Sequence, residues 1–406
     1  MTEVIEKTGN KKGYKKTKLG WIPEDWEMVR FNELFDEIVN LSNDTETYPL
    51  YSLTLENGVT PKTERYERSH LLKDKEENEF KLISQGEIAI NPMNLRFGAF
   101  FMSKVPKTVS LSAYYDIVKA KNDTVNTIFY DAFMKSTPAR RLYQRIATGS
   151  LDEKKRVHLS ELNKQFVPYP KKEEQEKIAE ILSAWDEGIE TLEKLIEQKE
   201  VLKNSLAQKY FQRKNNLFQL KQHKLGELFK NRKETNCCDL ELLSVCDGLG
   251  IVPRSQLNAK DNSNEDKSKY LKVCVGDLAY NTMRMWQGRC GVSSYEGIVS
   301  PAYTVCIPKD NIDVDYMYYL FKTPHMIHDF WRYSQGIVDD TLNLKFNNIE
   351  VIKVWIPDKE TQTKIAKLLK SYDEEIQILN SKLEKLKEQK KGLMQKLLTG
   401  QIRVKV

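Results

Sequence analysis

The sequence has few of the features that mark secreted, membrane-spanning or disulfide-bonded proteins. No apolar run approaches the ~18 residues of a membrane span, and the lysine-rich start MTEVIEKTGNKKGYKK lacks the apolar segment of a secretory signal. The cysteines form no CxxC pair and all lie in the second half of the chain: Cys237, Cys238, Cys246, Cys274, Cys290 and Cys306. A disulfide scheme would leave the first half without crosslinks, so reduced thiols are favoured. These absences predict a cytoplasmic protein.

The chain also lacks a recognisable catalytic motif, because no P-loop, GxSxG or HExxH occurs in it. NPMN at 91–94 is close to the NPPY-type loop of amino-methyltransferases, but its aromatic is missing and no glycine-rich turn precedes it. His325 and His328 lie one helical turn apart without a third ligand at a plausible spacing, so a polar helix face is favoured over a metal site. DEKK at 152–155 faintly resembles a nuclease motif, but a chain with 30% charged residues is expected to contain such a match by chance. No active site and no metal site are predicted.

The chain is long and mildly basic. The 406 residues are enough for two or three domains with separate cores. The net charge of +6 and the pI near 8.7 suit a nucleic-acid partner, although many proteins without such a partner share this balance.

An internal repeat organises the chain. EEQEKIAEIL at 173–182 and ETQTKIAKLL at 360–369 agree at six of ten positions, and Ile365 follows Ile178 by 187 positions. The match extends upstream through QGEIAINPM (85–93) with VGDLAYNTM (275–283), and VRFNELFDE (29–37) with HKLGELFKN (223–231). The period is far longer than that of a solenoid repeat, so a duplicated domain is predicted.

Each copy ends in a long helix with a heptad pattern. In the second copy the spacing alternates between four and three, with Lys390 as the one interruption: Ile365, Leu369, Tyr372, Ile376, Leu379, Leu383, Leu386, Leu393 and Leu397. The first copy carries a seam that Lys199 and Lys203 weaken: Ile178, Leu182, Trp185, Ile189, Leu192, Ile196, Leu206 and Tyr210. Such seams with charged flanks predict a coiled coil, and the simplest partner of each helix is the other copy.

The remaining parts of each copy predict an α+β fold. Short β-rich segments bounded by Gly, Pro or Asn, such as EIAINPM and SPAYTVCIP, precede amphipathic helices such as RRLYQRIA and HMIHDFWRYS. The predicted organisation is a basic tail (1–18), a first globular domain (19–170), a central helix (171–214), a second globular domain (215–357) and a C-terminal helix with its tail (358–406).

Two loops in each copy carry basic, amide and aromatic side chains. NLRFG (94–98) corresponds to RMWQGR (284–289), and TGSLDEKKRVH (148–158) corresponds to QGIVDDTLNLK (335–345). Arg, Lys, Asn and Gln hydrogen-bond base edges and phosphates, although solvated surface loops can have the same composition. The loops differ between the copies while their frameworks match, so the two copies would recognise two different half-sites.

The chain resembles a specificity (S) subunit of a Type I restriction–modification system. The resemblance covers essentially the whole chain and rests on LGWIPEDWEMVRFNELF, on the P-x-x-E-x-Q-x-K-I-A helix starts at 170–179 and 357–366, and on LLTGQIRV at the end. PKKEEQ and PDKETQ replace the more usual PPLxEQ of the family. The resemblance implies two α/β target-recognition domains, joined by two long helices that form an antiparallel coiled coil with pseudo-twofold symmetry.

The resemblance further implies a DNA-binding chain without catalysis or a cofactor of its own. It would read an interrupted double-stranded DNA target and bind two methylation subunits, which carry S-adenosylmethionine, with restriction subunits joining outside. The DNA-contact candidates are Arg96, Lys154, Lys155 and Arg156 in the first domain and Arg284, Arg289, Asn343 and Lys345 in the second. Base readout is expected from Arg96, Arg284 and Asn343, and phosphate contact from the lysines.

The candidates for holding the helix pair together or docking the partner subunits lie on the heptad seams: Ile178, Leu182, Trp185, Ile365, Leu369 and Tyr372. Two alternatives remain from the sequence. The chain could be a coiled-coil scaffold that never contacts DNA, or a fused enzyme, which would need a cofactor-binding motif that the sequence lacks.

Overall fold

The computed structural model describes residues 12–62, 79–151, 154–212, 217–246, 250–257, 263–338 and 341–405. Most of the predicted basic tail, at 1–11, and the first two residues of DEKK, at 152–153, lie outside the described residues. The chain divides into two compact units. Unit 1 is Met1–Thr191 with Leu383–Val406, and unit 2 is Leu192–Lys382. Each unit therefore contains one globular part and a segment of each of two long helices.

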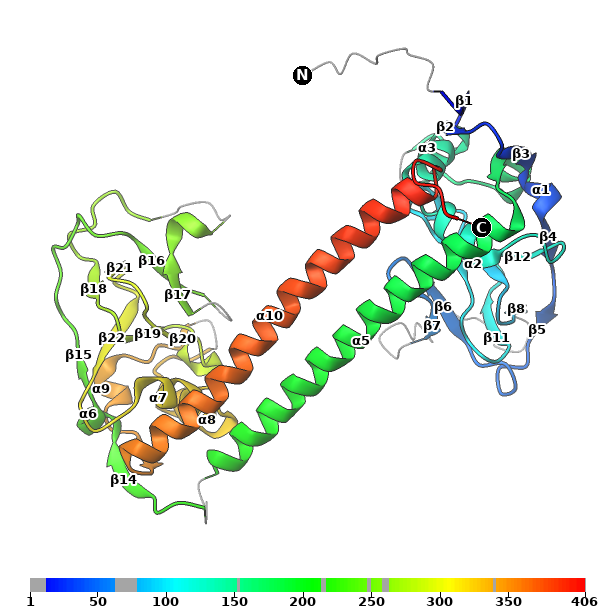
Figure 1. Cartoon of the computed structure of the whole chain (residues 1–406). Helices are drawn as coiled ribbons and strands as arrows, with labels where there is room; N and C mark the ends of the chain where they lie inside the picture. The colour runs from blue at the N-terminus through cyan, green and yellow to red at the C-terminus, as the bar shows by residue number, and fades with distance from the viewer. Residues whose placement is uncertain are drawn as a thin grey trace. The chain divides into compact units, whose positions relative to one another are not determined.

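A four-stranded antiparallel sheet forms the centre of each globular part (Figure 1). Its order is β10-β9-β12-β4 in unit 1 and β20-β19-β22-β15 in unit 2. The strands are β4 (Phe35–Ile38), β9 (Ile88–Ile90), β10 (Phe100–Met102), β12 (Asp116–Ala120), β15 (Phe229–Asn231), β19 (Leu278–Asn281), β20 (Cys290–Val292) and β22 (Tyr303–Pro308). The repeat in sequence is thus a repeat in topology, which confirms the predicted duplication.

Smaller antiparallel sheets complete the units, and each of those in unit 2 has a counterpart in unit 1. In unit 1 they are β1 (Tyr14–Thr17) with β2 (Gly20–Pro23), β3 (Glu27–Arg30) with β13 (Phe166–Tyr169), β6 (Tyr51–Thr54) with β7 (Gly58–Pro61), and β5 (Leu41–Ser42), β8 (Phe80–Ile83) and β11 (Val109–Ser112). In unit 2 they are β14 (Lys221–Lys224) with β23 (Lys353–Ile356), β16 (Leu243–Cys246) with β17 (Gly250–Pro253), and β18 (Leu271–Val273) with β21 (Gly297–Val299).

Short helices follow the central strands. A capping side chain starts the first helix of each pair, because Asn126 accepts from the Phe129 amide and Asp313 accepts from the Tyr316 amide. These helices are α2 (Thr127–Phe133) and α3 (Thr137–Ile146) in unit 1, and α7 (Val314–Phe321) and α8 (Pro324–Tyr333) in unit 2. Single-turn helices complete the set: α1 (Phe31–Leu34), α4 (Leu159–Leu162), α6 (Leu225–Leu228) and α9 (Phe346–Ile349).

The two long helices are α5 (Lys172–Tyr210) and α10 (Lys359–Leu397). In unit 1, Asp186 of α5 forms an ion pair with Lys390 of α10, and Leu182 shares a core with Leu397. Residue numbers therefore increase along α5 in the direction in which they decrease along α10, so the two segments run antiparallel. In unit 2, Lys203 pairs with Asp373, and Lys199 lies 2.9 Å from Glu375, in the same antiparallel sense.

Every apolar residue of the two predicted seams is buried or partly buried. Lys390, which interrupts the second seam, and Lys203, which weakens the first, occupy corresponding positions and form corresponding ion pairs. A lysine is accommodated in each seam because the facing helix supplies an aspartate. The predicted coiled-coil pairing is confirmed within each unit.

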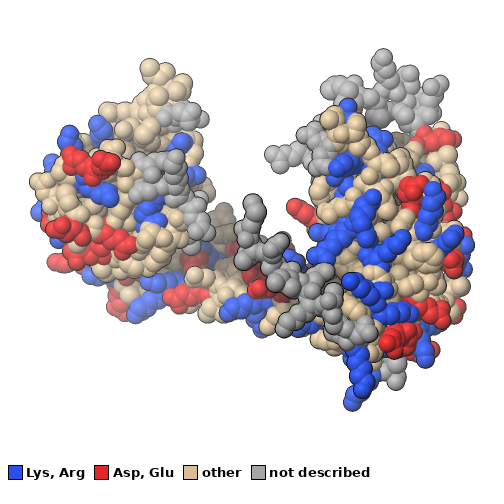
Figure 2. Space-filling view, turned by 90° about the horizontal axis from the view of Figure 1, so that it is seen from above, with Lys and Arg blue, Asp and Glu red and all other residues tan. Residues whose placement is uncertain are grey.

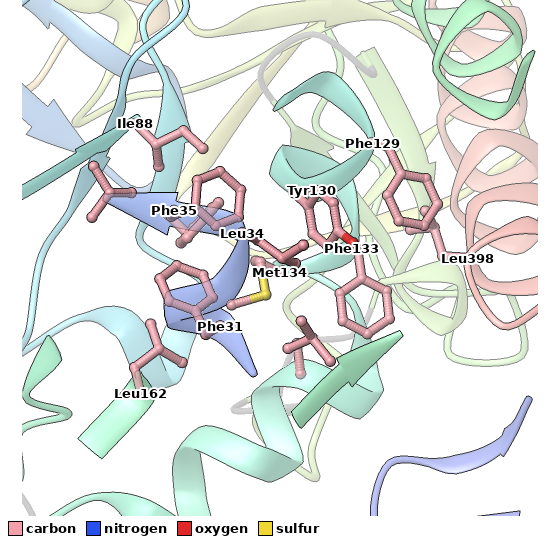
Figure 3. Packing of buried hydrophobic residues seen from close by; sticks show 14 of the residues in the cluster. Phe31, Leu34, Phe35, Ile88, Phe129, Tyr130, Phe133, Met134, Leu162 and Leu398 are labelled. Atoms are coloured by element: carbon pink, nitrogen blue, oxygen red, sulfur yellow. The ribbon is translucent and has the colours of Figure 1, made fainter. Parts of the chain in front are cut away.

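The core of unit 1 is rich in aromatic side chains (Figure 3). Phe31 and Phe35 stack with ring centroids 4.9 Å apart, and Tyr130 meets Phe35 edge-on at 5.5 Å. Leu398, which directly follows α10, joins the same cluster. Unit 2 has a corresponding core that includes Ile365 and Leu369. The start of α5 and the end of α10 therefore pack in the core of unit 1, and the start of α10 packs in the core of unit 2.

The two ends of the described chain meet in unit 1. The Tyr14 hydroxyl donates to the Gly400 carbonyl at 2.8 Å. Arg403 donates to both carboxylate oxygens of Asp25 and of Glu174, at 2.7–3.0 Å. Glu174 is only 3% exposed and also accepts from the Trp26 indole nitrogen at 2.8 Å. These bonds join β1, the turn that follows β2, the start of α5 and the residues after α10.

Candidate nucleic-acid interface

The first predicted loop of unit 1 is a compact turn. Asn91 follows β9, and its side-chain oxygen accepts from the Met93 amide at 3.0 Å. A single 3₁₀ turn, η2 (Leu95–Phe97), comes next and ends at Gly98 with φ of +95°. Gly98 needs this left-handed conformation, and a Cβ there would lie 3.1 Å from the Arg140 guanidinium of α3. The turn that carries Arg96 therefore packs against the Arg140 side chain of α3 at Gly98.

The second predicted loop of unit 1 leaves α3 and returns beside the first loop. Thr148 and Arg156 exchange two backbone hydrogen bonds of 2.9 Å, which close the loop at its base. Gly149, with φ of +142°, fits so closely that a Cβ would lie 2.9 Å from the Lys154 carbonyl oxygen. The Val157 amide donates to the Pro92 carbonyl at 2.9 Å. This last bond joins the two loops.

Unit 2 repeats the arrangement with other side chains. Gln335 and Asn343 exchange two backbone hydrogen bonds of 2.8 and 2.9 Å, and Gly336 has φ of +147°. The Leu344 amide donates to the Thr282 carbonyl at 2.8 Å, just as Val157 does to Pro92. The turn η5 (Met285–Gln287) corresponds to η2. The structure thus brings the two predicted loops of each unit side by side.

The predicted DNA-contact residues all reach the surface to some extent. Lys154, Arg156, Arg289 and Lys345 are exposed, and Arg96, Lys155, Arg284 and Asn343 are partly exposed. The Arg96 guanidinium lies 5.3 Å from the centre of the exposed Phe97 ring. The side-chain oxygen of Asn343 is buried and accepts no hydrogen bond within the described residues. The Asn343 side chain would therefore have to rotate before this oxygen could accept from a base.

Unit 1 also contains a cavity of about 320 Å³ beside the second loop. It is lined in part by Tyr114, Asp116, Arg156 and His158. The Arg156 guanidinium lies 5.5 Å from the centre of the Tyr114 ring. Burial raises the pKa of the Asp116 carboxyl, and Lys81 at 3.9 Å opposes that shift. The cavity therefore presents a cationic donor, Arg156, and a carboxyl acceptor, Asp116.

Sequence reasoning missed the exposed face of α3. Arg140, Arg141 and Arg145 are exposed on this helix, directly before the second loop, and Arg145 donates to the Lys18 carbonyl at 2.9 Å. Figure 2 shows Lys and Arg side chains gathered on the face of unit 1 at the right of the view. The signal was present in the sequence as RRLYQR, but only the contact of Arg140 with the first loop links it to the interface.

The seam residues lie where helix and core meet. Ile178, Leu182, Ile365 and Leu369 are at most 4% exposed and belong to the cores of their units. Trp185 and Tyr372 are partly exposed.

Within the described ranges, no group of three or more His, Cys, Asp or Glu side chains could hold a metal ion. His325 and His328 lie on α8, where His328 packs 6.0 Å from the Trp331 ring. None of the helices formed by those ranges is long and apolar enough to cross a bilayer.

Comparison with known proteins finds one family. The sequence pattern described as "Type I restriction modification DNA specificity domain" matches residues 23–201 and 255–388. The Type I restriction enzyme MjaVIII specificity subunit of Methanocaldococcus jannaschii is 24% identical, over 95% of this chain and 94% of the relative. The crystal structure of the S subunit of a Type I restriction–modification system from M. genitalium has a TM-score of 0.57 at 16% identity, covering 92% of this chain and 96% of that one.

A second solved structure shares the fold to the same degree. It was described for complex assembly and conformational transition of the Type I restriction–modification system. Its TM-score is 0.57 at 14% identity, with 94% of this chain and 99% of that chain covered.

Proposed function

Because the chain belongs to the family of Type I restriction–modification DNA specificity proteins, we propose that its two units each read one half of an interrupted DNA target. The observation that carries this proposal is the repeated loop pair. The same backbone bonds join the loops in both units, from Val157 to Pro92 and from Leu344 to Thr282, while the exposed side chains differ. One scaffold with two sets of side chains is suited to reading two different half-sites.

Specific roles follow from side-chain chemistry. Arg96 and Arg284 would donate to guanine, and Asn343 would pair with adenine, because these pairings are bidentate in the major groove. Lys154, Lys155 and Lys345 would contact phosphates and position the units without reading sequence. Catalysis would belong to other subunits of the complex, with S-adenosylmethionine carried by the methylation subunits.

Assembly with two methylation subunits and with restriction subunits is part of the proposal. The four buried seam residues would hold the helix pair onto the cores. Docking would fall to side chains that remain accessible, such as Trp185 and Tyr372 at corresponding positions of α5 and α10. Equivalent positions in two copies allow two identical partners to bind by equivalent contacts.

The test is a genome-wide map of methylated adenines in the source strain, with and without this gene. Loss of one interrupted two-part motif on deletion would establish the function and give the target sequence. An unchanged map in a strain that expresses the complex would contradict DNA recognition and favour a coiled-coil scaffold.

A further inference from the structure

A buried residue anchors an extended segment beside the first loop in each unit. Val157 and Leu344 are fully buried and occupy corresponding positions, 187 residues apart. The amide of each bonds to a carbonyl of the first loop, at 2.9 and 2.8 Å. Successive side chains of an extended chain point to opposite sides. The residues on either side of each anchor therefore emerge together on the outer face.

These flanking residues form one pair in each unit. In unit 1 the pair is Arg156 and His158, both exposed. In unit 2 it is Asn343 and Lys345, of which Asn343 is partly exposed. The backbone of each pair is fixed by the bridge at its first residue, by the anchor bond at the residue between, and by the short helix whose amides donate to the carbonyl of its second residue. A fixed backbone beneath two outward side chains is the arrangement that hydrogen-bond readout requires, because loose donors do not discriminate between bases.

The cavity of unit 1 shows what its pair could recognise. Arg156 and His158 both line it, and Asp116 contributes a carboxylate to the same lining. In the major groove guanine presents two acceptors, which arginine contacts with two donors, and cytosine presents an amino donor, which a carboxylate accepts. A cavity with donors and an acceptor side by side therefore matches a G·C base pair. Unit 2 has an asparagine where unit 1 has Arg156, and asparagine pairs with adenine.

We propose that Arg156 and His158 are the specificity-determining pair of unit 1, that they read a G·C base pair together with Asp116, and that Asn343 is the corresponding base-reading residue of unit 2, with Lys345 beside it on a phosphate. Arg156 contacts the guanine, Asp116 accepts from the cytosine amino group, and His158 donates to an acceptor of the same base pair. This assignment rests on the proposed DNA-reading function and adds which base pair unit 1 reads and with which residues.

The experiment uses the full chain, expressed with its own methylation subunits, and maps methylated motifs for wild type, R156A, H158A and N343A. R156A and H158A should each relax the same G·C position of one half-site, with roughly tenfold or greater loss of discrimination. N343A should relax only the other half-site. The intact half-site in each variant serves as the control for folding and assembly. K177A removes a partly exposed lysine of α5 that pairs with Glu180, and it should leave the motif unchanged.

A transplant provides the stronger test. The double variant R156N/H158K gives unit 1 the pair of unit 2, and the preference at the affected position should shift from G·C towards A·T. An unchanged motif in R156A and in the transplant would overturn the assignment, as would a half-site without a G·C pair. Equal weakening on all DNA sequences would also overturn it, because phosphate contacts act in that way. Absence of any interrupted motif in the wild type would instead contradict the proposed function itself.

Discussion

At the scale of single residues, the two glutamines at the starts of the long helices explain part of the repeated motif. The Gln175 amide donates to the Pro170 carbonyl at 2.8 Å, and its oxygen accepts from the Asn126 amide at 3.0 Å. Gln362 makes the same two bonds, to Pro357 at 2.8 Å and from Asp313 at 2.9 Å. Each glutamine is buried and links the start of a long helix to the cap of a short one.

The variant Q175A should therefore lower the free energy of unfolding by about 2–3 kcal/mol, because it leaves a partly buried amide and a buried carbonyl without this partner. Denaturation in urea measures the loss, and hydrogen exchange should place it in unit 1. The matched control is Q198A, since Gln198 is exposed on the same helix. A change below about 0.5 kcal/mol in Q175A would show that water replaces the amide at no cost.

The sequence marks these two glutamines as equivalent but does not identify their partners. The N-cap residues Asn126 and Asp313 lie 49 positions earlier, and only the packed fold brings them together. His158 shows the same limit. Its position on a segment anchored by Val157 depends on one long-range hydrogen bond to Pro92, for which the sequence has no local signal. Periodicity, by contrast, predicted both helices, because an apolar seam is a local pattern.

At the scale of secondary-structure elements, the ion pairs across α5 and α10 fix how the helices are paired. Lys390 with Asp186 and Lys203 with Asp373 place polar groups at corresponding positions of each seam. A shift of one helix along the other would bring each lysine against apolar residues, which costs more than the pair gains. The sequence shows these lysines only as interruptions, because the facing residue is known only once the pairing is known.

The two pairs should differ in their contribution to stability. Asp373 also accepts from the Tyr319 hydroxyl at 2.6 Å, and Tyr319 is largely buried, with burial as the main cause that raises its pKa. The variant D373A should lower the free energy of unfolding by about 2 kcal/mol, because it leaves that hydroxyl unpaired. D186A should cost less than about 1 kcal/mol, since half of the Asp186 side chain is exposed.

Urea denaturation of both variants measures this difference. E374A is the control, because Glu374 is an exposed acid next to Asp373. Equal losses in D373A and D186A would mean that Tyr319 contributes nothing to the pair.

At the scale of the whole molecule, unit 1 is closed by residues from both ends of the described chain. Arg403 and Asp25 are 378 positions apart, and Glu174 lies between them in sequence. Because Leu397 and Leu398 also belong to the core of unit 1, this unit cannot complete its packing until α10 has formed. Unit 2, Leu192–Lys382, is continuous in sequence and has no such requirement.

The variant R403A should therefore destabilise unit 1 by about 2 kcal/mol and leave unit 2 unchanged, because the buried Glu174 carboxylate loses both of its bonds to Arg403 and keeps the one from the Trp26 indole. The effect should depend on pH. Arg403 lowers the pKa of Asp25, chiefly through its hydrogen bonds, so this stabilisation is present above the ordinary aspartate pKa of about 4 and is lost as the pH falls through the lowered value. The gap between wild type and R403A should be constant near neutral pH and narrow in acid. Hydrogen exchange resolved by unit, followed from pH 7 to pH 3, measures both effects.

The conservative variant R403K should recover only part of the stability, since lysine cannot make the two paired bonds to Asp25. Equal protection of the two units in R403A would contradict closure of unit 1 by the chain ends.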